Sequence, residues 1–313
     1  MTMIFAKNSC ITLLVGCLLL IGIPAKAQQA PMYSQYMFNM LQINPAYAGN
    51  RASDNITALY RDQWVGLAGA PKTMVVSWDK RFEQSNEGFG LQIYNDQLGI
   101  EKTTGVQGFF SHHIAFENSF LALGISGGIL NYQANYSQAH PDDPTDPLFQ
   151  SNVNGWLPTI GFGALYATEN WYAAFSVPAL LHTQIDAINY LDQDDMGGNN
   201  HYFLTGGYIF DVTDNVKLKP SIMIKDVKGA PIQYDFNVNC WFMDILSIGA
   251  SYRTGDAVVG MLEFQLTPQL RLGYAYDYTI SVLQGYSGGT HEFMLRYEIG
   301  SNKKEQVLSP RYY

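Results

Sequence analysis

The chain has 313 residues and a formal net charge of −9, with 29 glycines and 21 tyrosines. The excess of acidic residues excludes a protein that binds nucleic acid through a basic patch. Two of the three cysteines fall within the first 27 residues and only Cys240 lies beyond them, so no disulfide is expected within the mature chain.

Residues 1–27 are typical of a secretory signal peptide. Lys7 supplies positive charge, an apolar run follows, and the Ala-Lys-Ala sequence of residues 25–27 matches a cleavage site. Cys17 offers an alternative, a lipoprotein signal, but it lies in the middle of the apolar run. We therefore predict export and a mature chain that begins at Gln28.

The next segment, residues 28–52, fits neither a strand nor a long helix. Its apolar residues, Met37 and Phe38 among them, do not alternate, and Asn44-Pro45 would end a helix. Burial of each large apolar side chain stabilises by roughly 1.5–3 kcal/mol, so the segment should not stay in water. We expect it to plug the barrel predicted below, or to pack against its periplasmic mouth. Docking onto a periplasmic partner is the alternative.

From residue 53 to residue 300, apolar and polar residues alternate with a period of two. Near the end of this region, Leu272 and Tyr274 share one face, and Arg271 and Asp277 share the other. Side chains alternate across a strand, so each such segment has an apolar and a polar face. About 14 segments follow this pattern, near residues 53–65, 71–83, 87–97, 101–116, 118–134, 155–168, 170–178, 199–212, 214–227, 231–243, 245–254, 256–266, 269–280 and 289–299.

A soluble β-sandwich would alternate in the same way, but the details favour a membrane barrel. The segments are long, their polar face carries charges at mid-strand, and aromatic residues gather towards their ends. Short turns also alternate with longer connections, near residues 135–154, 179–198 and 281–288. This asymmetry is expected of barrels whose long loops face outward and whose tight turns face the periplasm.

The prediction is an all-β fold, a transmembrane outer-membrane β-barrel of about 14 antiparallel strands formed by residues 53–300. An open sheet is excluded in lipid because its edges would lack hydrogen-bond partners. Both termini are expected in the periplasm, with residues 301–313 as a C-terminal tail.

Nine charged residues are expected on the polar face that lines the lumen. They are Lys217, Lys219, Lys225, Asp235, Glu263, Arg271, Asp277, Arg296 and Glu298. One interpretation is a lumen that binds or conducts a solute, and the other, which we prefer, is a network of ion pairs that fills the barrel. The mixed signs do not suggest a simple cation or anion filter.

No catalytic, cofactor or metal site is predicted. Residues 285–289 match the G-x-S-x-G pattern of α/β-hydrolases, but that motif needs a helix after the serine and a strand is expected here. His112 and His113 are adjacent in a strand and point to opposite faces, so they cannot chelate one ion. Residues 192–197 begin like a calcium loop but lack later ligands, and are interpreted as a solvated acidic loop, with weak calcium binding as the alternative.

Three stretches carry a resemblance to a known family. They are QYMFNMLQINPAYAGN (35–50), YRDQWVGLAGAPKTMVVSWD (60–79) and GGTHEFMLRYEIG (288–300), followed by SPRYY at the C-terminus. In this order they resemble the PorP/SprF family of outer-membrane proteins of the type IX secretion system of Bacteroidota, from about residue 31 onward. The matching residues are Asn44, Pro45, Ala46, Tyr47, Gly49, Arg61, Gln63, Trp64, Gly66, Gly69, Pro71, Lys72, Gly289, His291 and Glu292.

The resemblance implies a barrel component without enzymatic activity. It would help particular cargo proteins, often large adhesins with type B C-terminal sorting domains, to reach and stay on the cell surface, with a link to gliding motility. The implied partners are this cargo, a periplasmic ring lipoprotein and its partner, a peptidoglycan-binding subunit and outer-membrane lipid. The barrel physics alone leaves a porin or solute channel as the alternative. An outer-membrane enzyme is a third interpretation that no motif supports.

Overall fold

The structure is a computed structural model that describes residues 32–51, 53–82, 85–138, 151–180, 200–227 and 230–299. The predicted signal peptide, the acidic loop at residues 192–197 and the tail at residues 301–313 lie outside these residues. Within them, no helix is both long enough and apolar enough to span a membrane.

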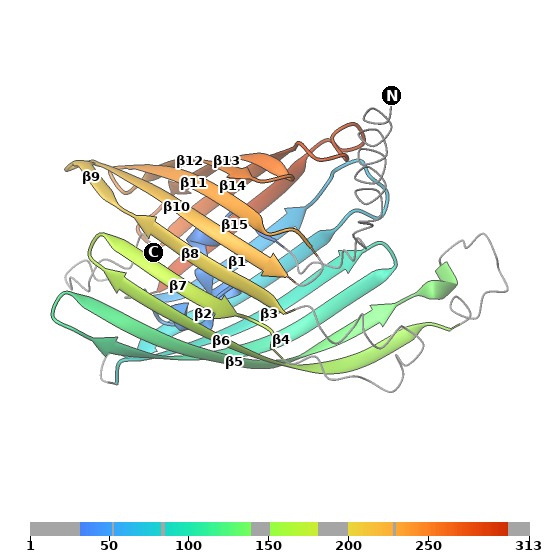
Figure 1. Cartoon of the computed structure of the whole chain (residues 1–313), viewed down its shortest axis with the longest axis horizontal. Coiled ribbons are helices and arrows are strands. Elements are labelled where there is room, and N and C mark those ends of the chain that lie inside the picture. The colour runs from blue at the N-terminus through green and yellow to red at the C-terminus, as the bar shows by residue number, and fades with distance from the viewer. Residues whose placement is uncertain are drawn as a thin grey trace, which may run out of the picture.

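The described chain forms one antiparallel sheet of 15 strands (Figure 1). They are β1 (Asp54–Asp62), β2 (Lys72–Phe82), β3 (Glu87–Leu98), β4 (Glu101–Ala115), β5 (Ser119–Ala134), β6 (Val153–Thr168), β7 (Trp171–Val177), β8 (His201–Tyr208), β9 (Phe210–Thr213), β10 (Val216–Val227), β11 (Gln233–Phe242), β12 (Leu246–Arg253), β13 (Ala257–Gln265), β14 (Leu270–Thr279) and β15 (Thr290–Ile299).

The sheet closes on itself. Neighbouring strands pair in chain order, β15 returns to pair with β1, and β10 pairs with β11. Strands β8 and β9 are separated only by Ile209 and both pair with β10, so they make one strand of the wall. The predicted barrel of 14 antiparallel strands is therefore confirmed. Closure leaves no free edge, which is what a sheet in lipid requires.

The two faces of the wall differ in polarity. On β2 the side chains of Met74 and Val76 are 56% and 51% exposed on the outer surface, whereas Thr73 and Ser77 are buried inside. The same alternation runs around the barrel, with apolar side chains outward and polar or charged side chains inward. This is the pattern of a barrel that contacts lipid on its outer face.

The longer connections lie at one end of the barrel, together with the short turns at residues 99–100 and 254–256, and the other end has tight turns throughout. Tight turns such as residues 116–118 lie at one end, here called the short-turn end, at the left of Figure 1. The loops at residues 63–71 and 280–289 lie at the other, the long-loop end, where β5 and β7 also end. Strand β1 begins and β15 ends at the short-turn end.

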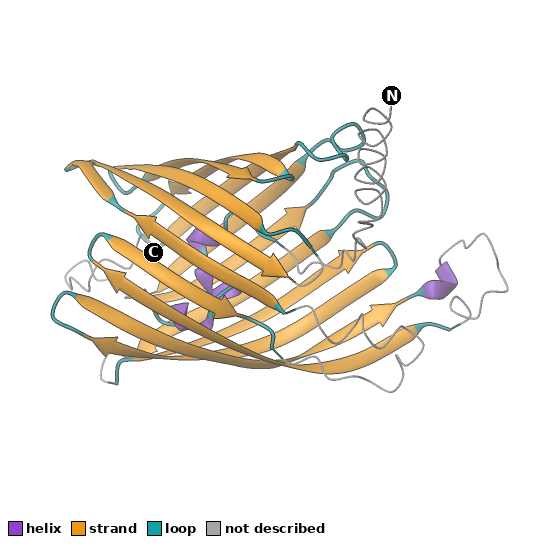
Figure 2. Cartoon of the chain, in the orientation of Figure 1, coloured by secondary structure: helices purple, strands orange, loops and turns teal. Residues whose placement is uncertain are grey.

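Residues 32–51 form an inner segment that lies inside the barrel, where Figure 2 shows its helices in purple. It contains three short 3₁₀ helices, η1 (Tyr36–Phe38), η2 (Met40–Gln42) and η3 (Pro45–Tyr47). Almost every side chain in it is buried, and its apolar residues are the centre of the hydrophobic core. The core is completed by large apolar side chains of the wall, among them Leu165, Trp241 and Met294, which pack with the inner segment.

A charge on the outer face should destabilise the barrel. Replacing Val76 with lysine at mid-strand should lower the free energy of unfolding in lipid vesicles by about 2–4 kcal/mol, because the ammonium group would lie in the hydrocarbon. The control is Val76→Ala, which removes apolar area without adding charge and should cost clearly less. Equal losses for the two variants in urea titrations would contradict the lipid-facing assignment.

Candidate functional site

At the long-loop end, three charged side chains of adjacent strands hold the beginning of the inner segment. The two carboxylate oxygens of Glu292 accept hydrogen bonds from the backbone N–H groups of Ser34 and Gln35, at 2.9 and 2.8 Å. The Ser34 hydroxyl donates to Asp277 at 2.6 Å and accepts from Arg61 at 2.8 Å. Backbone N–H groups that would otherwise be buried without partners are thus satisfied by charged acceptors of the wall.

The same charges form a buried ion-pair cluster. Arg61 lies 2.9 Å from both Asp277 and Glu292, and all three side chains are at most 3% exposed. Arg253 extends the cluster, 3.7 Å from Asp277 and 3.2 Å from Asp235. A buried charge is tolerated only with such partners, and removing one partner typically costs about 3–5 kcal/mol.

A second cluster lies further towards the short-turn end. Arg296 and Arg51 both donate to the backbone carbonyl of Phe38, at 2.9 and 3.0 Å. Arg296 also pairs with Glu263, which in turn lies 3.3 Å from Arg271. Two guanidinium groups thus satisfy the backbone carbonyl at the C-terminal end of η1, which would otherwise be buried without a partner.

The other charged residues that were predicted to line the lumen also lie on the inner face of the wall. Eight of the nine are buried, and Lys217 is the exception, because it lies near the short-turn end and pairs with Asp211 at 2.7 Å. Glu298 joins the second cluster, 3.5 Å from Arg296. The Lys219 ammonium group lies 4.9 Å from the ring centroid of Tyr172. Lys225 is buried on β10.

Arg61 and Glu292 belong to the family motif, but they were not predicted to line the lumen. Arg253 and Asp79, which are also buried on the inner face, were not predicted either. The period-two pattern could have identified them, because each of these residues follows the same alternation as its neighbours.

Tyr36 links the inner segment to the wall, since its hydroxyl accepts a hydrogen bond from Asn237 on β11 at 2.6 Å. Burial raises the pKa of the Tyr36 phenol well above its ordinary value, so this group stays protonated.

The second half of the inner segment is seated on glycines of the wall. A β-carbon added at Gly88, Gly124 or Gly163 would lie 1.9, 2.2 and 1.9 Å from an atom of residues 44–48. These distances are far below any allowed contact, so a larger residue at these points would displace the segment. The three glycines come from β3, β5 and β6 and form a smooth seat for the Asn-Pro-Ala-Tyr-Ala motif.

Asn44 sets the local structure of that motif. Its side-chain oxygen accepts a hydrogen bond from the Ala46 N–H at 2.9 Å and caps η3, with Pro45 at the first helical position. Its amide group donates to the carbonyl of Ala164 on β6 at 3.3 Å. Gly49 then turns the chain towards β1 with a φ of +60°, a conformation that glycine adopts at little cost.

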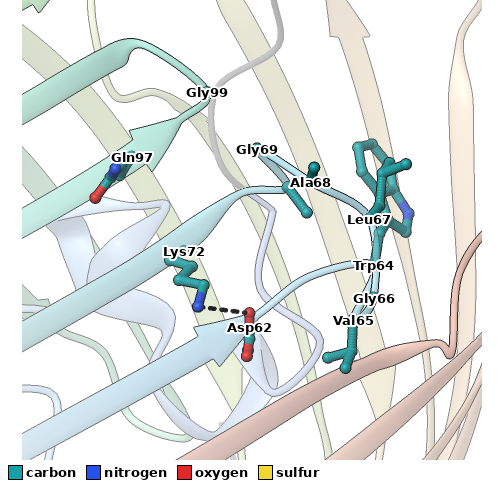
Figure 3. Close-up of a pocket in the computed structure, with 11 residues that line it drawn as sticks. Asp62, Trp64, Val65, Gly66, Leu67, Ala68, Gly69, Lys72, Gln97 and Gly99 are labelled. Carbon is teal, nitrogen blue, oxygen red and sulfur yellow. Dashed lines mark ion pairs between the residues drawn. The ribbon is translucent and has the colours of Figure 1, made fainter.

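The other family motif residues lie in or beside the loop at residues 63–71, at the long-loop end (Figure 3). Trp64 has a left-handed φ of 49°, and its N–H donates to the Thr290 hydroxyl at 3.1 Å. The Val65 N–H of the loop donates to the Gly289 carbonyl at 2.8 Å, and the Gly69 carbonyl of the loop accepts from the Gly99 N–H at 2.8 Å. The loop is therefore held on both sides, over a cavity of about 490 Å³.

The family motif thus occupies three places. Asn44, Pro45, Ala46, Tyr47 and Gly49 lie in the inner segment, Arg61 and Glu292 in the lumen cluster, and Gln63, Trp64, Gly66, Gly69, Pro71 and Gly289 in the loops of the long-loop end. Lys72 and His291 lie beside them on the outer face of β2 and β15.

None of the described groups suggests catalysis. Ser287 lies in a loop that leads directly into β15, so the helix required by the hydrolase motif is replaced by a strand. The Ser111 hydroxyl lies 3.0 Å from a ring nitrogen of His113, but it donates to the Ala48 carbonyl at 2.7 Å and so holds the inner segment. In the described ranges, no group of three or more His, Cys, Asp and Glu residues could hold a metal ion.

Enlarging a glycine of the seat should displace the inner segment. Gly124→Val should lower the stability by about 1–3 kcal/mol or more, as overpacking does, because its side chain would collide with Pro45 and Ala46. Gly127→Val on the same strand is the matched control, since a β-carbon there meets no atom within 4 Å. The midpoint temperature of the heat-dependent shift in electrophoretic migration measures the effect. Similar losses in the two variants would show that the seat is not tightly packed.

Several solved outer-membrane proteins are similar to this chain in structure. The Ralstonia pickettii toluene transporter TbuX has a TM-score of 0.50 at 10% identity, over 88% of this chain and 96% of that one. Omp33 of Acinetobacter baumannii has a TM-score of 0.48 at 10% identity, over 80% of this chain and 99% of that one. A Pseudomonas aeruginosa FadL homologue has a TM-score of 0.46 at 12% identity, over 88% of this chain and 96% of that one. At these identities the likeness to TbuX supports the outer-membrane barrel fold alone.

A search of curated proteins found no match. The family model described as "Type IX secretion system membrane protein PorP/SprF" matches residues 25–297, which is most of the chain and includes the inner segment. The resemblance seen in the three motifs is therefore confirmed. The chain belongs to the PorP/SprF family of type IX secretion system membrane proteins.

Proposed function

We propose that this barrel is a non-enzymatic component that delivers or anchors specific cargo of the type IX secretion system at the cell surface. The cargo would be a large adhesin with a type B C-terminal sorting domain, with a link to gliding motility. Family membership supports a role in secretion. The observation that carries the proposal is the filled lumen, because a barrel occupied by its own chain is better suited to hold a partner than to pass one.

The lumen contacts argue for a fixed inner segment. Hydrogen bonds to Glu292 and Arg296 hold its first half, and the glycine seat holds its second half. Most of the buried charges around it are paired within the wall, so they do not form a row of vacant sites along which an ion or solute could move. A porin or solute channel remains the second candidate, favoured only by the barrel fold.

The orientation follows from loop length. We place the long-loop end outside the cell and the short-turn end in the periplasm, as in other outer-membrane barrels. The wall then begins and ends in the periplasm, where a ring lipoprotein and its partner, or a peptidoglycan-binding subunit, would contact it. Cargo would dock at the long-loop end. Within the described residues the inner segment begins at the long-loop end, where Ser34 contacts Glu292. The periplasmic position predicted for the N-terminus concerns residues before this segment, which lie outside the described ones.

Loss of the protein should remove one adhesin, or a small set, from the cell surface while other type IX cargo is still exported. The measurement is quantitative proteomics of surface and secreted fractions from a deletion strain, with the complemented strain as control. A deletion that blocks all cargo equally would identify a general translocation component instead.

The intact protein should conduct poorly in a planar bilayer, and deletion of residues 31–43 should open a water-filled passage. The deletion removes the apolar residues of η1 and η2, and with them Ser34 and Gln35, whose backbone N–H groups bind Glu292. Its folding is checked by the heat-dependent shift in migration. Large stable channels in the intact protein, or no change on deletion in a folded variant, would favour the channel interpretation or the docking of this segment onto a partner.

A further inference from the structure

A cavity on the outer wall is not used by the proposed function. It lies at the long-loop end between the loop at residues 63–71 and the strand ends beneath it, and Asp62, Lys72 and Gln97 line it (Figure 3). These three side chains project from the outer face, because Thr73, the next residue after Lys72, is buried on the inner face. The cavity is therefore next to the surface that faces lipid, and not to the lumen.

The register extends this site into a polar row around the barrel. His291, Asp62, Lys72, Gln97 and Lys102 are direct neighbours across β15, β1, β2, β3 and β4. The Lys72 side chain is 57% exposed, and its ammonium group lies 3.8 Å from Asp62, too far for a hydrogen bond. Two lysines against one carboxylate leave the row with a net positive charge.

Beneath this row the outer wall becomes apolar, at once on β2 and one level lower on β3 and β4, after the hydrogen-bonded pair Asn95 and Thr104. Met74 and Val76 follow Lys72 along β2, and Ile93 lies beside Val76 on β3, each at least half exposed. The boundary between such an apolar band and a polar row marks the level at which a barrel meets the lipid headgroups. The cavity thus lies where a headgroup would be found when its acyl chains cover Met74 and Val76.

The size and rigidity of the cavity suit a headgroup. Its volume of about 490 Å³ falls in the range of small-molecule sites. The loop above it is held by hydrogen bonds to Gly289 and Gly99, so the cavity is formed before a ligand arrives and less ordering is needed on binding.

We propose that this cavity binds the phosphorylated sugar headgroup of an outer-leaflet glycolipid. Lys72 contacts the phosphate from within the cavity, Lys102 contacts it from the neighbouring part of the row, and Gln97 donates to a sugar hydroxyl. Lysine is a suitable phosphate ligand because its ammonium group is a compact charge. Asp62 opposes the phosphate and competes for Lys72, so it weakens binding.

The test is native mass spectrometry of the full-length protein in detergent with added lipid A, in its diphosphorylated and dephosphorylated forms. The double variant Lys72→Gln, Lys102→Gln should raise the apparent Kd for the phosphorylated lipid by about tenfold or more, since two charged contacts are lost. The matched control is Lys80→Gln, which removes an outward lysine from the same strand, near the short-turn end, and should leave the Kd unchanged. Asp62→Asn should lower the Kd, an effect that misfolding cannot imitate.

Three results would overturn the proposal. The double variant could bind the phosphorylated lipid as tightly as the parent protein. The dephosphorylated lipid could bind the parent as tightly as the phosphorylated one, which would show that only the acyl chains matter. Inorganic phosphate could displace the lipid at equal concentration, which would indicate a site for a soluble anion. Cargo display does not enter these measurements, so their outcome is independent of the proposed secretion role.

Discussion

The ion-pair cluster of Arg61, Asp277 and Glu292 is the interaction on which the rest of the structure depends. Its members come from β1, β14 and β15, the strands on both sides of the pairing that closes the barrel. The carboxylates are satisfied partly by Arg61 and partly by Ser34 and the backbone of the inner segment. Wall and inner segment therefore depend on each other, because neither could bury these groups alone without a large desolvation penalty.

The inner segment is held in two different ways along its length. Its first half is held by charged side chains of the wall, and its second half by close approach to wall glycines. The second mode needs Gly88, Gly124 and Gly163 on the wall, since any β-carbon there would overlap the segment. Together these contacts hold the inner segment against the large apolar side chains that the wall turns inward, such as Leu165, Trp241 and Met294.

The family motif around Arg61 connects the lumen with the outer surface. Because side chains alternate along β1, Arg61 points into the lumen and Asp62 points outward beside Lys72. The chain then passes into the loop that contains Trp64, which is bonded to the start of β15. A short stretch thus holds the inner segment, borders the lipid-facing cavity and shapes the long-loop end, and a change in any one of these should affect the others.

The sequence alone determined the class of fold, the positions of nearly all strands and the side of the wall on which each residue lies. These properties depend on the alternation of apolar and polar residues within each strand, and this alternation is a local property of the chain. Only the tertiary structure showed the interruption of one wall strand at Ile209, the path of the inner segment and the pairing of the buried charges. Arg61 and Glu292 are separated by 231 positions in the chain, so their contact depends on closure of the barrel. The glycine seat depends likewise on three strands that meet the inner segment only after folding, and no local pattern records such an approach.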